Sequence, residues 1–210
     1  IGRTFEESLL KAIRSLETGV FHLYMEKFDE KTREELLSYI KAGTDDRIFA
    51  VAQLLRLGCN VQQIAFETKI DGFFLEKMKK IIEMENMLKA NPWNRDVLHE
   101  AKRGGFSDRA VAWLWNTDED TVFRIRKEMH LFPVYKMIDT CASEFDSYVP
   151  YFYSTYEEEN ESIAEDRKKI LVLGSGPIRI GQGVEFDYST VHAVKTIRNA
   201  GYEAIVINNN

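Results

Sequence analysis

The sequence predicts a mainly α-helical protein, in which an all-helical domain of repeated three-helix units is followed by a truncated βαβ piece of an α/β domain. Three observations lead to this prediction. Segments with helix caps and apolar residues at helical spacing follow one another up to about residue 130. Two of these stretches are similar to each other at a distance of 47 residues. Near the C-terminus, two apolar runs flank a glycine-rich turn and a helical segment, which is the order of a βαβ unit.

The N-terminal part contains three helical segments before the repeat is complete. Thr4 and Glu7 have the spacing of a capping box, which opens the first segment. The second runs from residue 31 to residue 41. The third, residues 46–57, is strongly apolar and is therefore expected at the centre of the core, with Gly58 ending it in a left-handed conformation.

The repeat relates two copies of a three-helix unit. In each copy a glycine ends one helix, Asn60 or Ser107 caps a short helix, and an acidic residue opens a third. Two such copies predict a compact all-α domain. The equivalent residues are Gly58–Phe66 and Gly105–Trp113, then Asp71 and Asp118, Leu75 and Val122, and Met78 and Ile125.

Helix–turn–helix units of this shape also occur in DNA-binding proteins, so a regulator that joins them to a nucleotide-binding βαβ module is the second hypothesis. Charge disfavours it, because residues 45–128 contain 14 Lys and Arg and 14 Asp and Glu, and the whole chain has a formal net charge of −6. The short helix 108–115 is also dominated by apolar residues, whereas a recognition helix needs polar ones on an exposed face. We expect no binding to nucleic acid.

Composition is that of a globular cytoplasmic protein. No apolar run reaches the roughly 18 residues that span a bilayer, so no membrane association is expected. Cys59 and Cys141 stand far apart, which indicates reduced thiols, and no Cys or His has metal-ligand spacing. The chain begins at Ile1 without an initiator Met and stops beside an apolar run, so we expect an internal piece of a longer protein.

Residues 133–139 and 148–153 have an extended pattern, rich in β-branched and aromatic residues. The aromatic side chains between residues 148 and 156 predict either a segment that packs onto a neighbouring surface or a stacking platform for a base or substrate. Residues 157–166 are acidic and poor in apolar residues, which is typical of a solvated linker.

The C-terminal segment predicts two parallel strands and one covering helix. Strands 170–174 and 203–208 are expected to pair in parallel, with helix 188–200 packed over them. The second face of this small sheet should lie against the helical domain, the segment 148–153 or another chain, because its residues are apolar too. The helix residues expected over the strands are Val191, Val194 and Ile197.

The turn after the first strand is only partly similar to a dinucleotide-binding fingerprint. Arg179 stands where the fingerprint requires its third glycine. Asn208 ends the second strand, where Asp or Glu would bind the ribose. The pattern therefore disfavours NAD as a ligand.

Extended to residue 188, the same turn closely resembles a more specific signature. Residues 174–188, GSGPIRIGQGVEFDY, resemble the opening of the second synthetase half of the carbamoyl phosphate synthetase large subunit. Residues 132–142 and 150–156 resemble the segment that precedes it in this family, and residues 1–7 resemble the last stretch of the first half. These similarities occur in the family's order and extend from one end of the chain to the other.

The resemblance implies four regions. Residues 1–19 would be the C-terminal helix of the first synthetase half, and residues 20–156 a helical oligomerisation domain with an extended tail. Residues 157–168 would be an acidic linker, and residues 169–210 the truncated start of the second half, its pre-ATP-grasp domain.

The resemblance also implies the activity of the parent enzyme, an ATP-dependent ligase of arginine and pyrimidine biosynthesis. Its first half would phosphorylate bicarbonate and form carbamate with ammonia from a glutaminase small subunit, and its second half would phosphorylate carbamate. ATP, Mg²⁺ and potassium would bind outside this chain, so no cofactor, metal or catalytic residue is expected here. The implied partners are the glutaminase subunit and other large subunits, and Trp113 and Trp115 support self-association because one small core does not hold all the aromatic residues.

Three residues are candidates for a functional role through the resemblance alone. In the family, the glycine-rich loop lies near the internal route of the carbamate, so Arg179, Gln182 and Glu185 are candidates for lining it. The alternative is structural, since Glu185 and Asp187 at the start of a helix favour its dipole and can pair with Arg179.

Overall fold

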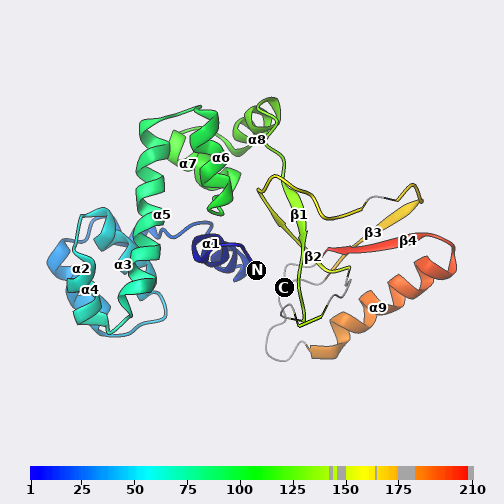
Figure 1. The fold of residues 1–210 in the computed structure, drawn as a ribbon. Coiled ribbons are helices and arrows are strands. Elements are labelled where there is room, and N and C mark those ends of the chain that lie inside the picture. The colour runs from blue at the N-terminus through cyan, green and yellow to red at the C-terminus, as the bar shows by residue number, and fades with distance from the viewer. Residues whose placement is uncertain (142–143, 146–149, 164, 175–182, 208–210) are drawn as a thin grey trace. The chain divides into compact units, whose positions relative to one another are not determined.

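The computed structural model describes residues 1–141, 144–145, 150–163, 165–174 and 183–207, with the side chains of 183–187 excepted. The chain divides into two compact units, Ile1–Ser162 and Ile163–Asn210, and each is described by itself. Figure 1 shows that helices dominate the first unit and that strands flank one helix in the second.

The first unit contains most of the helices and one β-hairpin. In order, its elements are α1 (Phe5–Ser15), the short 3₁₀ helix η1 (Glu26–Phe28), α2 (Arg33–Lys41), α3 (Arg47–Arg56), α4 (Val61–Thr68), α5 (Gly72–Ala90), α6 (Arg95–Arg103), α7 (Asp108–Trp115), α8 (Glu119–Glu128), β1 (Val134–Met137) and β2 (Phe152–Thr155).

The repeat predicted from sequence is confirmed as a repeat of structure. Helices α4 and α7 have bounds 47 residues apart, and the starts of α5 and α8 have the same spacing. The turns agree as well, because Gly58 and Gly105 both have a positive φ, of 72° and 90°. Lys69 and Asn116, which follow the two short helices, are also both left-handed, with φ values of 59° and 53°. The first copy thus comprises α3, α4 and the start of α5, and the second comprises α6, α7 and α8.

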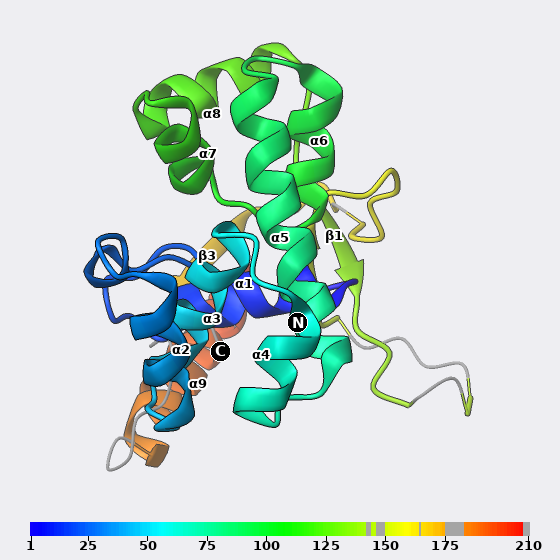
Figure 2. The same ribbon diagram turned by 90° about the vertical axis from the view of Figure 1, so that its left-hand side faces the viewer.

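Helix α5 joins the two copies. Its first turns lie beside α4 and its last turns beside α6 and α7, as Figures 1 and 2 show. Helix α3 lies at the centre of the core as predicted, because six of its ten residues are buried. They are Phe49, Ala50, Val51, Ala52, Leu54 and Leu55.

The hairpin follows α8 and is bound along both edges of β1. On one edge β1 pairs antiparallel with β2, with Val134 opposite Thr155. On the other edge the amide of Glu161 donates to the carbonyl of Tyr135 at 2.9 Å, and the Glu161 carboxylate accepts from the amide of Met137 at 2.7 Å. Most of the described residues of the acidic segment are exposed, as predicted, but residues 160 and 161 are hydrogen-bonded to β1.

The second unit is the predicted βαβ arrangement. Strands β3 (Lys169–Leu173) and β4 (Glu203–Ile207) pair in parallel, and α9 (Gly183–Asn199) contacts both. The helix begins five residues before the predicted start at residue 188.

Leu171 and Val206 lie on opposite faces of this sheet, because Leu171 is opposite Ile205 and Val172 is opposite Val206. The expectation that the helical domain, the segment 148–153 or another chain covers the second face stays a prediction, because each unit is described by itself. Of the three helix residues predicted over the strands, Val194 and Ile197 are half-buried, but Val191 is 50% exposed. The expectation for Val191 is therefore wrong, because a helix of 17 residues is longer than strands of five residues and extends past them. Among the described helices of both units, none is long and apolar enough to cross a membrane.

Candidate functional site

The residues predicted from the carbamate route lie outside the described part of the chain. Arg179 and Gln182 fall in 175–182, and Glu185 lies in the first turn of α9, where the backbone alone is described. Their role therefore stays a prediction. The described residues offer two buried polar networks and an exposed aromatic cluster instead.

The first network is centred on Glu85 of α5. Arg56 at the end of α3 donates to both carboxylate oxygens, with Nε–Oε2 and Nη2–Oε1 distances of 2.8 and 2.7 Å. His22 donates from Nε2 to Oε1 at 2.9 Å, and both His22 and Glu85 are completely buried. Arg56 also donates to the carbonyl of Leu23 at 2.7 Å. The network thus ties the segment after α1 to α3 and α5.

Burial and pairing act in opposite directions on these groups. Burial alone would raise the pKa of Glu85, but the hydrogen bonds from Arg56 and His22 outweigh it and lower this pKa to about 2. Burial lowers the pKa of His22, despite the opposing effect of Glu85. His22 is therefore neutral, and its Nδ1 has no hydrogen-bond partner among the described residues.

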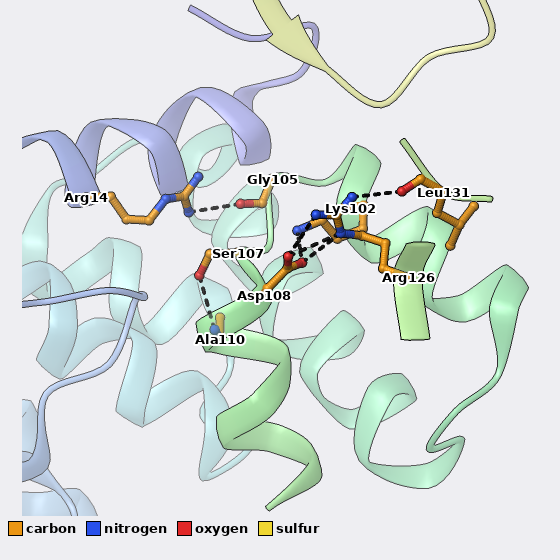
Figure 3. Close-up of polar contacts among 8 residues, drawn as sticks. All are labelled: Arg14, Lys102, Gly105, Ser107, Asp108, Ala110, Arg126 and Leu131. Carbon is orange, nitrogen blue, oxygen red and sulfur yellow. Dashed lines mark hydrogen bonds and ion pairs between the residues drawn. The ribbon is translucent and has the colours of Figure 1, made fainter. Parts of the chain in front are cut away.

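The second network belongs to the second repeat and is shown in Figure 3. The carboxylate of Asp108, at the start of α7, lies between two cations: Lys102 Nζ is 2.7 Å from Oδ1, and Arg126 Nη2 is 3.0 Å from Oδ2. Arg126 also donates to the carbonyl of Leu131 at 2.8 Å. The ring of Tyr156 faces both cations, with its centroid 5.0 Å from Lys102 Nζ and 5.6 Å from Arg126 Cζ.

Burial lowers the pKa of Lys102 to about 8, against the effect of Asp108. For Asp108, burial alone would raise the pKa, but Lys102 and Arg126 outweigh it and hold the pKa below its ordinary value. Burial raises the pKa of Tyr156 to about 12, so its phenol is neutral. The chemistry of both networks is that of internal ion pairing. Among the described residues, no group of three or more His, Cys, Asp or Glu side chains could hold a metal ion.

The tryptophans do not form the exposed surface expected from sequence. Trp115 is 9% exposed, donates from its indole N–H to the carbonyl of Leu88 at 2.9 Å, and stacks against Trp93. Trp113 is half-buried beside Phe21 and Tyr24. Their use as support for self-association is therefore wrong, because segments of the same chain cover both rings.

The exposed aromatic surface of the helical unit is formed by phenylalanines instead. Phe73 and Phe74 at the start of α5 are 57% and 44% exposed, and their ring centroids are 5.4 Å apart. Phe5 of α1 joins them, 5.4 Å from Phe74 and 6.3 Å from Phe73. We call these three residues the phenylalanine cluster. The pair Phe73-Phe74, in the first turn of the helix that Asp71 caps, was a sequence signal for it that helical periodicity did not single out.

The short helix of the second repeat is unsuited to reading a DNA groove. Five of its eight residues are buried, namely Ala110, Val111, Ala112, Leu114 and Trp115. The exposed Arg109 lies with its guanidinium over the ring of Phe21, 4.6 Å from its centroid. A recognition helix presents polar side chains to solvent instead.

Comparison with protein families decides between the two hypotheses. Residues 1–130 match the model of the carbamoyl-phosphate synthetase large chain, oligomerisation domain. The chain belongs to this family. Residues 166–210 match a second model, the carbamoyl phosphate synthase preATP-grasp domain. The matches fall on the helical repeats and on the βαβ arrangement, so each family model corresponds to one structural unit of this synthetase chain.

Proposed function

We propose that this chain is the helical association and connecting module of a carbamoyl phosphate synthetase large chain. The observation that carries the proposal is the match of residues 1–130 to the oligomerisation domain. The phenylalanine cluster supports it, because it exposes contiguous aromatic surface on helices of the same region.

The cluster has the composition of an interface centre with a polar rim. Aromatic rings dominate the energetic centres of protein interfaces, whereas charged groups surround them. Here Lys77 lies beside the rings, with Nζ 5.5 Å from the Phe73 centroid and 3.5 Å from a carboxylate oxygen of Glu6. Burial of these rings in a second large chain would contribute at about 25 cal/mol per Å² of apolar surface.

For the parent enzyme we propose the ligase reaction of the family, in the cytoplasm and for arginine and pyrimidine biosynthesis. It would combine bicarbonate with ammonia supplied by a glutaminase small subunit and would use two ATP, with Mg²⁺ and potassium. The match to the preATP-grasp domain supports an ATP-dependent parent. In this assignment residues 1–19 end the first synthetase half, residues 20–156 associate, residues 157–168 link, and residues 169–210 open the second half.

Within this proposal, Arg179, Gln182 and Glu185 line the route of the carbamate, and the chain itself supplies no catalytic residue. The purified chain should therefore show no bicarbonate-dependent hydrolysis of ATP above background. A clear bicarbonate-stimulated release of phosphate would contradict this part of the proposal.

Sedimentation velocity over a range of concentrations tests the association. The wild-type chain should show a weight-average mass that rises with concentration, and the double substitution Phe73→Ser, Phe74→Ser should keep it monomeric. Phe123→Ser is the matched control, because Phe123 is 46% exposed on α8 and lies outside the cluster. A concentration-independent monomer in the wild type, or an unchanged double variant, would refute the interface.

A further inference from the structure

The two repeats carry different residues at one set of equivalent positions. In the first repeat a groove of about 330 Å³ lies along the start of α4, and Leu55, Val61 and Lys79 line it. Shifted by 47 residues, these positions become Lys102, Asp108 and Arg126. The ring of Tyr156, in the segment after β2, packs against Lys102 and Arg126.

The segment that carries Tyr156 contacts the helices near the end of β2, where the ring of Tyr153 lies with its centroid 5.5 Å from Nζ of Lys11. We call residues 152–161 the strap. Besides Tyr156, Lys11 of α1 donates to the carbonyl of Ser154 at 2.5 Å, and Arg103 lies 3.7 Å from a carboxylate oxygen of Glu157. Thr155, which precedes the tyrosine, is 2% exposed. The strap is thus anchored at one place, where β2 ends.

The hairpin depends on this anchor. A two-stranded hairpin alone is marginally stable in water, so β1 and β2 need a surface to rest on. The strap supplies both partners of β1, because β2 pairs with one edge and Glu161 with the other. Loss of the anchor should therefore loosen the whole hairpin while leaving the helices folded.

The first repeat indicates that polar residues at these positions are not needed to pack the helices. It forms the same short helix 47 residues earlier, between the same left-handed turns, with Leu55 and Val61 in two of the three positions. Burying three charged groups costs desolvation, and apolar replacements of such groups are often neutral or stabilising. In the second repeat these residues provide two cations that make cation–π contacts with the ring of Tyr156.

We propose that Tyr156 is held by a latch, which is formed by Lys102, Asp108 and Arg126. The latch directs the strap to the second repeat rather than the first and lets the strap detach as a unit. Asp108 holds the two cations in place, and the cations hold the ring, as the carboxylate between them in Figure 3 indicates. The strap ends at residue 161 and the second unit begins at Ile163, so the latch controls the segment through which the chain enters that unit.

Amide hydrogen exchange of the whole chain tests the latch, with the amides of Ile138 and Glu161 as reporters because both donate within the hairpin. Tyr156→Ala should raise their exchange rates at least tenfold and leave those of α7 and α8 unchanged. Tyr156→Phe should keep wild-type rates, because the ring and not the hydroxyl faces the cations. Tyr151→Ala, which removes a 48% exposed ring next to β2, is the control and should change them less than twofold.

A second variant separates the latch from general stability. The transplant Lys102→Leu, Asp108→Val, Arg126→Leu places the apolar residues of the first repeat at positions 102 and 108, and it also removes the third charge, which would otherwise be buried without its partner. It should keep or raise the thermal midpoint, yet exchange its hairpin amides as fast as Tyr156→Ala does. Wild-type hairpin protection in Tyr156→Ala, or in a folded transplant, overturns the proposal. If the transplant does not fold, the contrast between the Ala and Phe variants of Tyr156 decides alone.

Discussion

Glu85 is the residue on which the first half of the helical unit depends most. Its carboxylate accepts hydrogen bonds from the side chains of both Arg56 and His22 inside the core. Glu85→Ala would leave a guanidinium and an imidazole buried without their partner. Breaking a buried pair in this way costs about 3–5 kcal/mol of unfolding free energy.

Urea denaturation measures this loss. Glu83→Ala is the control on the same helix. The Glu83 side chain is 58% exposed, and its ion pair with Lys79 is long, with 3.7 Å between Oε1 and Nζ. We expect the control within about 0.5 kcal/mol of wild type. Similar losses in both variants would show that Glu85 is not the centre of the network.

His22 makes stability depend on pH. Because burial lowers its pKa in the folded chain, the unfolded chain takes up a proton first as the pH falls through about 6.5. The free energy of unfolding should therefore decrease between about pH 7 and pH 5.5. Glu85 acts in the same direction only in stronger acid, since its stabilisation is lost as the pH falls toward its folded pKa of about 2.

His22→Gln tests this dependence, because the amide can still donate to Glu85 but does not titrate. Denaturation curves at both pH values should differ less in the variant than in the wild type. An equal decrease in both would assign the pH dependence to other groups.

At the scale of residues, the sequence could identify neither the Glu85 network nor the Asp108 network, because the residues that pair lie far apart along the chain. Arg56 and Glu85 are separated by 29 positions, and His22 and Glu85 by 63. The second network did leave a signal. Lys102 and Asp108 stand where the first repeat has Leu55 and Val61, and charges at positions that are apolar in a duplicate indicate a local function.

At the scale of elements, the equivalent turns at Gly58 and Gly105 allow a direct comparison of the two repeats. Both glycines have a positive φ, but a Cβ at Gly58 would meet nothing within 4 Å. A Cβ at Gly105 would lie 2.7 Å from Cα and 3.1 Å from the carbonyl oxygen of Glu7, which are backbone atoms of α1. Helix α1 therefore packs directly on the turn of the second repeat.

Gly58→Ala should cost about 1 kcal/mol, which is the strain of a left-handed alanine. Gly105→Ala should cost a further 1–3 kcal/mol or so, because α1 must move away. Chemical denaturation of the two variants measures the difference. Equal costs would mean that α1 is not held against this turn.

Elements were predictable where local chemistry determines them. Asn60 and Ser107 accept hydrogen bonds from the first turns of α4 and α7, as their positions predicted. Thr4 caps α1 in the same way, but Glu7 accepts from the amide of Arg3 rather than completing the box on Thr4. That difference arises because Glu7 is 1% exposed beneath the second repeat, and such tertiary burial has no signature in a single helix.

For the molecule as a whole, the junction of the two units should be its most cleavable segment. Ile163 is 79% exposed and the side chain of Arg167 is 70% exposed. Brief trypsin treatment should cut first after Arg167 and release the helical unit, with Arg103 in α6 and the buried Arg126 in α8 cleaved much later. Mass spectrometry of the early fragments identifies the site. An initial cut within α3 would contradict the assignment of the core.

The division into a helical part and a βαβ part was predictable, because the two parts differ in the spacing of their apolar residues and in the capping and turn residues between their elements. The surroundings of the small sheet were not. The apolar residues of its strands indicate that both faces are covered, but a strand's sequence does not identify the layer that covers it.

The distribution of tryptophan has a spectroscopic consequence. All three tryptophans, Trp93, Trp113 and Trp115, lie between α5 and the end of α7, which places every one of them at the second repeat. Indole emission therefore follows the melting of that repeat and of the segment after α1 that packs on Trp113, whereas far-ultraviolet circular dichroism averages over all helices. If α5 transmits unfolding from one repeat to the other, the two curves superimpose; if each repeat melts by itself, they separate, and the order of melting can be read directly from which curve moves first.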